Sequence, residues 1–181
     1  MEKLPAQYKD LLDEKGPLIL IEALKLYGIR EIVGPQHNAT ILAWADEVNA
    51  TVGEFVKDDE QPWCALFMSV VEKRAGWVPP AGFDAIRAKS HAKWGDPIAG
   101  EPMLGDVLIF GRDGGGHVGI YVGEDKTHFH VLGGNQGNMV CISRISRDRL
   151  ITARRSPINS CPAYIRRIFR AGNGNVTTNE A

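Results

Sequence analysis

Cys64 and His117 are the residues of this chain whose types and surroundings favour nucleophilic catalysis. Cys64 lies in the segment 61–76 (QPWCALFMSVVEKRAG). We expect a helix there, because proline is tolerated in a first helical turn and glycine commonly ends a helix. In the first turn, unpaired backbone N–H groups and the positive end of the helix dipole stabilise a thiolate. The thiolate is the form of cysteine that attacks a carbonyl carbon, so this position suits a nucleophile.

A base for that thiol is available in the segment 105–123 (GDVLIFGRDGGGHVGIYVG). Its two apolar runs, separated by the glycine-rich residues 111–116, predict a β-hairpin with His117 at the start of the second strand. His117 would deprotonate Cys64 and later protonate the leaving amine. The backbone N–H of Cys64 is a candidate oxyanion donor, and Gln61 is the candidate for a second one.

The remaining cysteines and histidines indicate neither a disulfide framework nor a metal site. Cys141 lies in an apolar, strand-like run and Cys161 in a turn, and the spacing of the three cysteines fits no set of metal ligands. His128 and His130 share a strand face, but two histidines without a Cys, Asp or Glu at ligand spacing are weak evidence for zinc. We therefore expect no metal and no cofactor.

The elements that must position the thiol and the imidazole change character along the chain. Helical patterns cover 18–28, 41–48, 61–76 and 85–94, and short β-rich runs cover 107–110, 118–122, 128–132 and 139–142. Asn38 or Thr40 is expected to cap the second of these helices. Helices followed by a strand meander predict an α+β fold with an antiparallel sheet.

The length suits a single folded domain, for which we expect the range 18–170. The polar residues 1–17, which end in a Lys-Gly-Pro break, are expected to form an N-terminal extension. Residues 171–181, rich in Gly, Asn and Thr, are expected to form a disordered tail.

The composition excludes several kinds of partner. Hydrophobic residues make up 44% of the chain and charged residues 24%, as in an ordinary globular protein. A formal net charge of −1 gives no reason to expect nucleic acid or an anionic membrane as partner. No apolar run approaches the roughly 20 residues needed to span a bilayer. The first residues carry no signal-peptide pattern, so we expect synthesis in the cytoplasm and delivery to any outside target by release or injection.

Several motifs of this chain follow one another in an order that is typical of one superfamily. They are 28–35 (GIREIVGP), 62–64 (PWC), 105–110 (GDVLIF), 114–123 (GGGHVGIYVG) and 132–136 (LGGNQ). Together they resemble the NlpC/P60 and CHAP superfamily of bacterial and phage cell-wall hydrolases. Members of that superfamily are similar to papain, with a Cys-bearing helix packed on a sheet that carries the His.

The resemblance implies a papain-like fold and a cysteine peptidase or amidase that cleaves an amide bond of peptidoglycan. The bond would lie within the stem peptide or join muramic acid to L-alanine. By the same analogy, the protein would be an endolysin released through a holin, an effector carried by an injection apparatus and matched by an immunity protein, or a wall-degrading part of a phage particle.

Two other classes of function stay open. The same scaffold could serve a cytosolic cysteine protease, deamidase or acyltransferase. It could also be a non-catalytic structural module of a phage particle, although an intact set of Cys64, His117 and Asn135 argues against this reading.

The third catalytic residue, which would orient the imidazole, has two candidates. Asn135 matches the asparagine of the superfamily's Gly-Gly-Asn turn, and its side-chain oxygen would accept the N–H of His117. His130 is the alternative, because relatives often place this residue at the start of the next strand.

Trp63, Tyr121 and Gln61 are the candidates for substrate contact. Trp63 precedes the nucleophile, and Tyr121 shares the strand face of His117, although core packing is the default for both aromatic rings. Gly119 on that face would let the Cys64 helix approach the strand closely.

Overall fold

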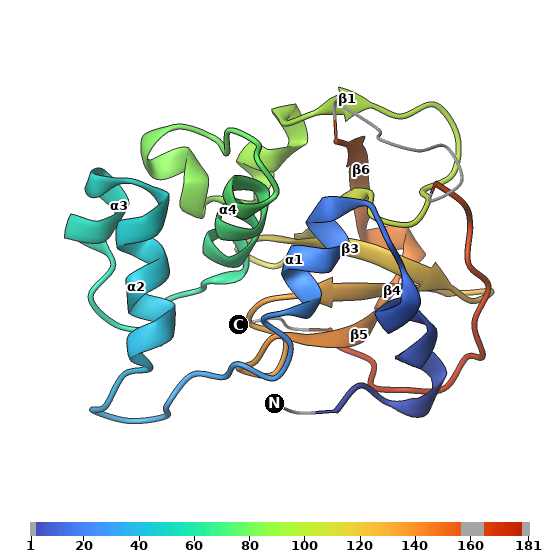
Figure 1. The fold of residues 1–181 in the computed structure, drawn as a ribbon, viewed down its shortest axis with the longest axis horizontal. Helices are drawn as coiled ribbons and strands as arrows, with labels where there is room; N and C mark the ends of the chain where they lie inside the picture. Colours follow the sequence, from blue (N-terminus) through green and yellow to red (C-terminus); the bar gives the residue numbers. More distant parts are fainter. Residues whose placement is uncertain (1–2, 157–164, 179–181) are drawn as a thin grey trace.

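Helices occupy the first half of the chain and strands the second, as expected for an α+β protein (Figure 1). The computed structural model describes residues 3–156 and 165–178, so Cys161 lies outside the described residues. The α-helices are α1 (Leu18–Leu24), α2 (Ala39–Val48), α3 (Ala50–Phe55) and α4 (Cys64–Arg74). The 3₁₀ segments are η1 (Ala6–Asp13), η2 (Gly82–Ile86), η3 (Ala88–Lys93) and η4 (Arg147–Arg149). The strands are β1 (Asp96–Pro97), β2 (Val107–Arg112), β3 (Gly115–Glu124), β4 (His128–Gly133), β5 (Cys141–Ser146) and β6 (Leu150–Arg155).

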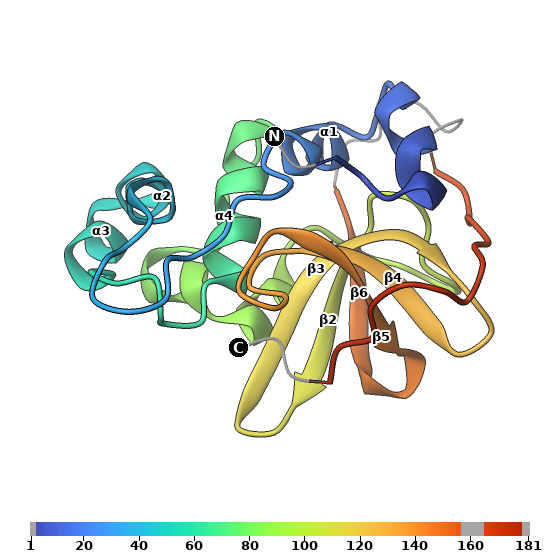
Figure 2. The same ribbon diagram turned by 90° about the horizontal axis from the view of Figure 1, so that it is seen from below.

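The strands form one antiparallel sheet in the order β1–β6–β2–β3–β4–β5. β2 to β5 follow one another as a meander, whereas β6 returns to pair with the free edge of β2. Figure 2 shows α1 and α4 over one face of the sheet, and α2 and α3 on the side of α4 away from the strands. β3, which carries His117, therefore lies inside the sheet and under the helical layer.

Both faces of the sheet are packed, because successive strand residues point to opposite sides. The larger core, shared with the helices, takes Val107, Ile109, Val118, Ile120 and Val122 from the two central strands. The smaller core on the other face takes Leu108, Phe110, Tyr121, Phe129 and Val131.

α4 is the central helix of the helical layer. Nine of its eleven residues are buried, so it is enclosed on nearly all sides. α2 packs against it, and the buried residues of α2 are Ile41, Trp44, Ala45 and Val48. Asn38 is the N-cap of α2, since its Oδ1 accepts the N–H of Thr40 at 2.9 Å.

The helical pattern over 85–94 predicted an α-helix, but the segment is 3₁₀-helical. The segment forms the two 3₁₀ turns η2 and η3, separated by an extended Arg87. Its buried residues recur at every third position, at Ala85, Ala88, His91 and Trp94. A spacing of three matches the 3₁₀ repeat rather than the α-helical one, so burial selects the tighter turn.

The β2–β3 hairpin is longer than predicted. Arg112 pairs with Gly115, which leaves a two-residue Asp113-Gly114 turn with Gly114 at φ 73°. Asp-Gly is a preferred sequence for such a tight turn. His117 is consequently the third residue of β3, opposite Phe110, rather than the residue that opens the strand.

The ends of the chain are part of the fold. Leu4, Tyr8 and Leu11 of the predicted N-terminal extension belong to the main core. Residues 165–178 run along the sheet, where the backbone of Arg144 bonds that of Asn175 and Thr177. Part of the predicted tail 171–181 thus makes backbone hydrogen bonds to β5, and residues 179–181 lie outside the described part. None of the described helices has the length and apolar character needed to cross a membrane.

Asp125 is a partly buried anchor for the N-terminal segment. The hydroxyl of Tyr8 donates to His130 Nδ1 at 2.7 Å, and His130 Nε2 lies 3.1 Å from Asp125 Oδ2. Arg144 Nε donates to the same oxygen at 2.8 Å, and the backbone N–H groups of Thr127 and His128 donate to the other. Burial opposes the charge of Asp125, but these donors outweigh burial and hold its pKa well below the usual value.

We expect Asp125→Asn to lower the free energy of unfolding at pH 7 by about 1.5–3 kcal/mol, the range for hydrogen bonds to a charged group. A depressed pKa stabilises the fold above the ordinary carboxyl pKa of about 4, and this stabilisation is lost as the pH falls. Urea unfolding at pH 7 and pH 3 should therefore show a difference between wild type and variant that shrinks in acid. A difference independent of pH would contradict this role of the carboxylate.

Candidate active site

Cys64 is the first residue of α4, with Trp63 as its N-cap. The first hydrogen bond of the helix runs from the N–H of Phe67 to the carbonyl of Trp63 at 2.9 Å. The N–H groups of Cys64, Ala65 and Leu66 therefore have no acceptor within the helix, as at any helix start. They are well placed to stabilise negative charge that develops beside the thiol.

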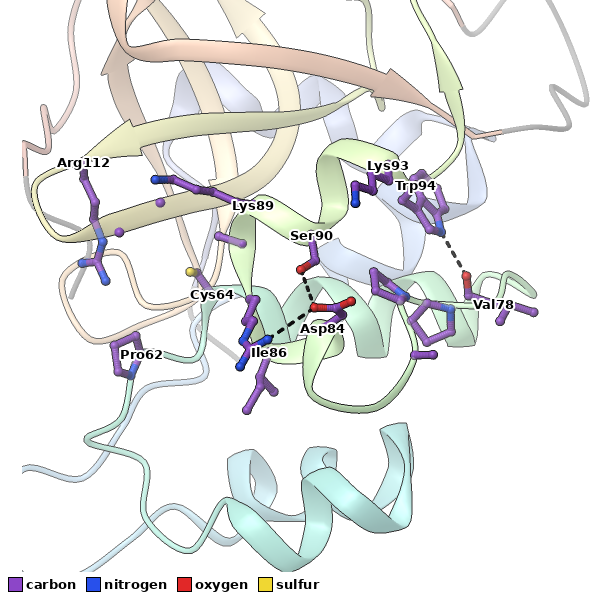
Figure 3. A pocket seen from close by; sticks show the side chains of 17 residues that line it. Pro62, Cys64, Val78, Asp84, Ile86, Lys89, Ser90, Lys93, Trp94 and Arg112 are labelled. Atoms are coloured by element: carbon purple, nitrogen blue, oxygen red, sulfur yellow. Dashed lines mark hydrogen bonds and ion pairs between the residues drawn. The ribbon is translucent and has the colours of Figure 1, made fainter.

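The thiol-bearing residue lines a pocket of about 720 Å³ (Figure 3). Its walls come from Pro62, from the proline-rich residues 78–81, from η2 and η3, and from the Gly115–Gly116 end of β3. Cys64 is 4% exposed, so the pocket is its route to solvent. His117 is fully buried and follows Gly116 directly, behind the pocket wall.

The imidazole of His117 is held by two neighbours. Its ring stacks on that of Phe110, with centroids 6.5 Å apart and an interplanar angle of 29°. Its Nε2 lies 3.0 Å from Oε1 of Gln136, and this contact is buried.

The amide of Gln136 can face His117 in only one way. Its Nε2 donates to the carbonyl oxygens of Val131 at 3.1 Å and Cys141 at 2.7 Å, and both acceptors require an N–H. Oε1 is thereby turned toward His117 and accepts a hydrogen bond from its Nε2–H. The neutral ring then carries its lone pair on Nδ1, which is the nitrogen able to act as a base.

Two consecutive glycines join this imidazole to the start of α4. A Cβ on Gly133 would lie 3.2 Å from His117 Nε2. A Cβ on Gly134 would lie 2.6 Å from Cβ of Phe67 and 2.8 Å from the ring of Trp63. The turn after β4 thus contacts both His117 and the first turn of the Cys64 helix, and only glycine permits so close an approach.

Gly119 has a different role from the predicted one. A Cβ on Gly119 would lie 2.5 Å from Cγ1 of Val131 and 3.0 Å from the carbonyl oxygen of Leu132. It makes room for the neighbouring strand β4, whereas the approach of α4 depends on Gly134.

Asn135 does not orient His117; its neighbour Gln136 does. The backbone of Asn135 is left-handed, with φ 55°, a conformation that asparagine tolerates better than most residues. Its Oδ1 is buried and has no hydrogen-bond partner among the described residues. Asn135 therefore shapes the turn that delivers Gln136.

His130, the alternative orienting residue, belongs to another cluster. Tyr8 and Asp125 occupy its two ring nitrogens. His130 of β4 pairs with Gly123, which lies near the end of β3, whereas His117 lies near the start of β3. The two histidines are therefore at opposite ends of the strand pair.

The three predicted substrate contacts are also placed elsewhere. Trp63 is 2% exposed and donates its Nε1–H to Glu31 at 3.1 Å. Tyr121 is fully buried in the smaller core, and its hydroxyl donates to Glu124. Gln61 turns its side-chain amide to Asp58 and is not part of the pocket wall. Burial of the aromatic rings outweighs their nearness to Cys64 and His117 in sequence.

Sequence reasoning missed the acidic residues that hold the start of α4. Glu31 accepts the Nε1–H of Trp63, and its own N–H donates to the carbonyl of Asn138. Buried Asp59 accepts the N–H groups of Ile32 at 3.0 Å and Asn38 at 2.7 Å. The motif 28–35 therefore connects the loop before Cys64 to the turn that carries Gln136. Glu31, the acidic residue of that motif, was the feature of the sequence that could have indicated this connection.

A second missed pair holds the pocket wall against α4. Glu72 of α4 and His91 of η3 are both fully buried, with Oε1 and Nδ1 2.9 Å apart. Burial raises the pKa of Glu72, although the neighbouring His91 favours its charged form. This contact sets η3, and with it one side of the pocket, relative to the helix that carries the thiol.

Comparison with known proteins finds no matching protein-family model and no significantly similar curated protein. Within residues 3–156 and 165–178, no group of three or more His, Cys, Asp or Glu side chains is arranged to hold a metal ion.

Gly134→Ala tests the close approach of α4. We expect a loss of about 1–3 kcal/mol of stability from overpacking and slower alkylation of Cys64 by iodoacetamide, because the first turn of α4 must shift. Gly111→Ala is the matched control, since its Cβ would meet its nearest atom at 3.8 Å, and should change stability by no more than about 0.5 kcal/mol. Equal effects of the two substitutions would argue against a special contact at Gly134.

Gln136→Ala and Asn135→Gly separate the two candidates for the orienting residue. Gln136→Ala should move the midpoint of the pH profile of Cys64 alkylation toward about 8.5, the value of a free thiol, because the imidazole is no longer held in the basic tautomer. Asn135→Gly should leave the profile unchanged, since glycine accepts a positive φ. The opposite pattern would return the role to Asn135.

Proposed function

We propose that this protein is a cysteine-dependent peptidoglycan hydrolase that cleaves an amide bond of the cell-wall peptide. The single observation that carries the catalytic part is the hydrogen bond of His117 to a Gln136 amide whose orientation is set by two carbonyls. Such a bond prepares Nδ1 as a base. Cys64 lines a pocket, and its neighbour Trp63 contacts the turn that carries Gln136.

The reaction would follow from these positions. His117 takes the proton of Cys64, and the thiolate attacks the carbonyl carbon of the substrate amide. N–H groups of the first turn of α4 stabilise the oxyanion. Protonated His117 then gives its proton to the leaving amine, and water activated by the neutral ring hydrolyses the thioester.

A papain-like arrangement is the form of α+β fold that we propose. It is supported by the packing of the Cys-bearing helix α4 on β3, the strand that carries His117. The order of elements, with the helix first and the antiparallel meander after it, agrees with the same arrangement.

The choice of peptidoglycan as substrate rests on the resemblance of the sequence motifs to cell-wall hydrolases. The positions of these motifs in the fold support the choice of peptidoglycan. The motif 28–35 contacts Trp63 through Glu31, and 132–136 contacts both Trp63 and His117. Motifs that are distant in sequence thus contact Trp63, the residue before Cys64, and His117.

Digestion of purified sacculi tests the proposal. Wild-type protein should release soluble muropeptides, and Cys64→Ala should lower the rate at least about a thousandfold, because the nucleophile is lost. Mass analysis of the fragments identifies the bond that is cut. Cys161→Ala, which removes a different thiol, serves as the cysteine control and should keep the rate.

Undiminished release by Cys64→Ala would overturn the cysteine mechanism. Intact sacculi, combined with a Cys64 thiol whose reactivity depends on Gln136, would instead favour a cytosolic protease, deamidase or acyltransferase.

A further inference from the structure

The pocket beside Cys64 has an excess of positive charge. Four cationic side chains line it, Arg87, Lys89, Lys93 and Arg112, against the single carboxylate of Asp84. The whole chain carries a formal net charge of −1. The lining of this pocket is therefore more positive than the chain as a whole.

The carboxylate in the pocket is already engaged. Asp84 accepts the hydroxyl of Ser90 at 2.9 Å and lies 3.7 Å from the guanidinium of Arg87. The ammonium groups of Lys89 and Lys93 have no hydrogen-bond or ion-pair partner within residues 3–156 and 165–178. Their charge is available to a ligand.

A second cavity, of about 880 Å³, shows the contrast. Its four arginines are paired with carboxylates: Arg144 with Asp125, Arg147 and Arg167 with Glu124, and Arg170 with Asp10. The arginines there serve the fold, whereas the two lysines beside the thiol are left for another partner.

The glycine run before His117 positions the cations. A Cβ on Gly116 would lie 3.0 Å from Cγ of Lys89, and one on Gly115 would lie 3.4 Å from Nε of Arg112. The stem of Lys89 therefore lies across the strand at the residue next to His117. Figure 3 shows Lys89 and Arg112 toward the Cys64 end of the pocket and Lys93 beside Trp94.

We propose that this pocket is a subsite for peptide carboxylates that flank the scissile amide, with Lys89 binding the nearer carboxylate and Lys93 a more distant one. The identity of the peptide rests on the proposed function. A stem peptide fits the chemistry, because a γ-linked glutamate and diaminopimelate keep free carboxylates along the chain. The volume suits a few peptide residues, and the concave shape suits a discrete ligand rather than a long polyanion.

A cycle of enzyme and substrate variants tests the contact. The two substrates are a synthetic stem tetrapeptide with the free α-carboxylate of its γ-linked glutamate and the same peptide with that group as a carboxamide. Wild type should prefer the acid by about tenfold in kcat/KM, as expected for one charge-assisted hydrogen bond, and mainly through KM. Lys89→Gln should lose most of this preference by slowing the acid peptide alone, and Lys93→Gln should lose less.

The control is Lys126→Gln, an exposed lysine in the second cavity, which should keep the full preference. Raising the salt concentration from 0.05 to 0.5 M should shrink the preference of wild type, since the screening length is only about 10 Å at 0.1 M. Equal slowing of both peptides by Lys89→Gln, or a wild type that does not discriminate, would overturn the subsite.

Binding of the same two peptides to Cys64→Ala by calorimetry separates this inference from the proposed function. Hydrolysis without a preference for the acid leaves the function standing and removes the subsite. Absence of hydrolysis, together with tighter binding of the acid that Lys89→Gln abolishes, leaves the subsite standing and removes the function.

Discussion

The side-chain amide of Gln136 is the constraint on which the candidate site depends. Two main-chain carbonyls take its two N–H groups, so only its oxygen is left for His117. A buried amide with all of its donors used cannot rotate without leaving polar groups unpaired, which is costly inside a protein. The orientation of the amide that meets the imidazole is therefore decided by backbone geometry at β4 and β5, and not by the elements that carry Cys64 and His117.

The surroundings of the site follow the same physical logic. Its scaffold contains buried polar side chains with matched partners: Glu31 with Trp63, Asp59 with two backbone N–H groups, and Glu72 with His91. Each bond joins segments that are far apart in sequence. Such contacts are stable only when both partners are in place, so they hold the start of α4, the turn after β4 and the pocket wall in one arrangement.

Sequence patterns predicted the helices and strands well where interactions between neighbouring residues determine them. The helix of Cys64, the capped helix after Asn38 and the strand runs all rest on periodicity, caps and turns, and they are present. The errors lie where distant contacts decide. The repeat of three over 85–94 became visible only through burial against α4. Asn135 and Gln136 are adjacent, and no local signal tells which side chain turns inward.

The amino-acid sequence by itself determined the α+β class, the thiol at a helix start and a histidine on a strand. These follow from short-range preferences that every segment carries with it. The tertiary structure alone decided which side chain bonds the imidazole of His117, the burial of Trp63 and Tyr121, and the position of Lys89 and Lys93 in the pocket that Cys64 lines. Those outcomes depend on contacts between segments that are distant in sequence, at the turn after β4 and along η3. Such contacts form only when the whole chain has folded.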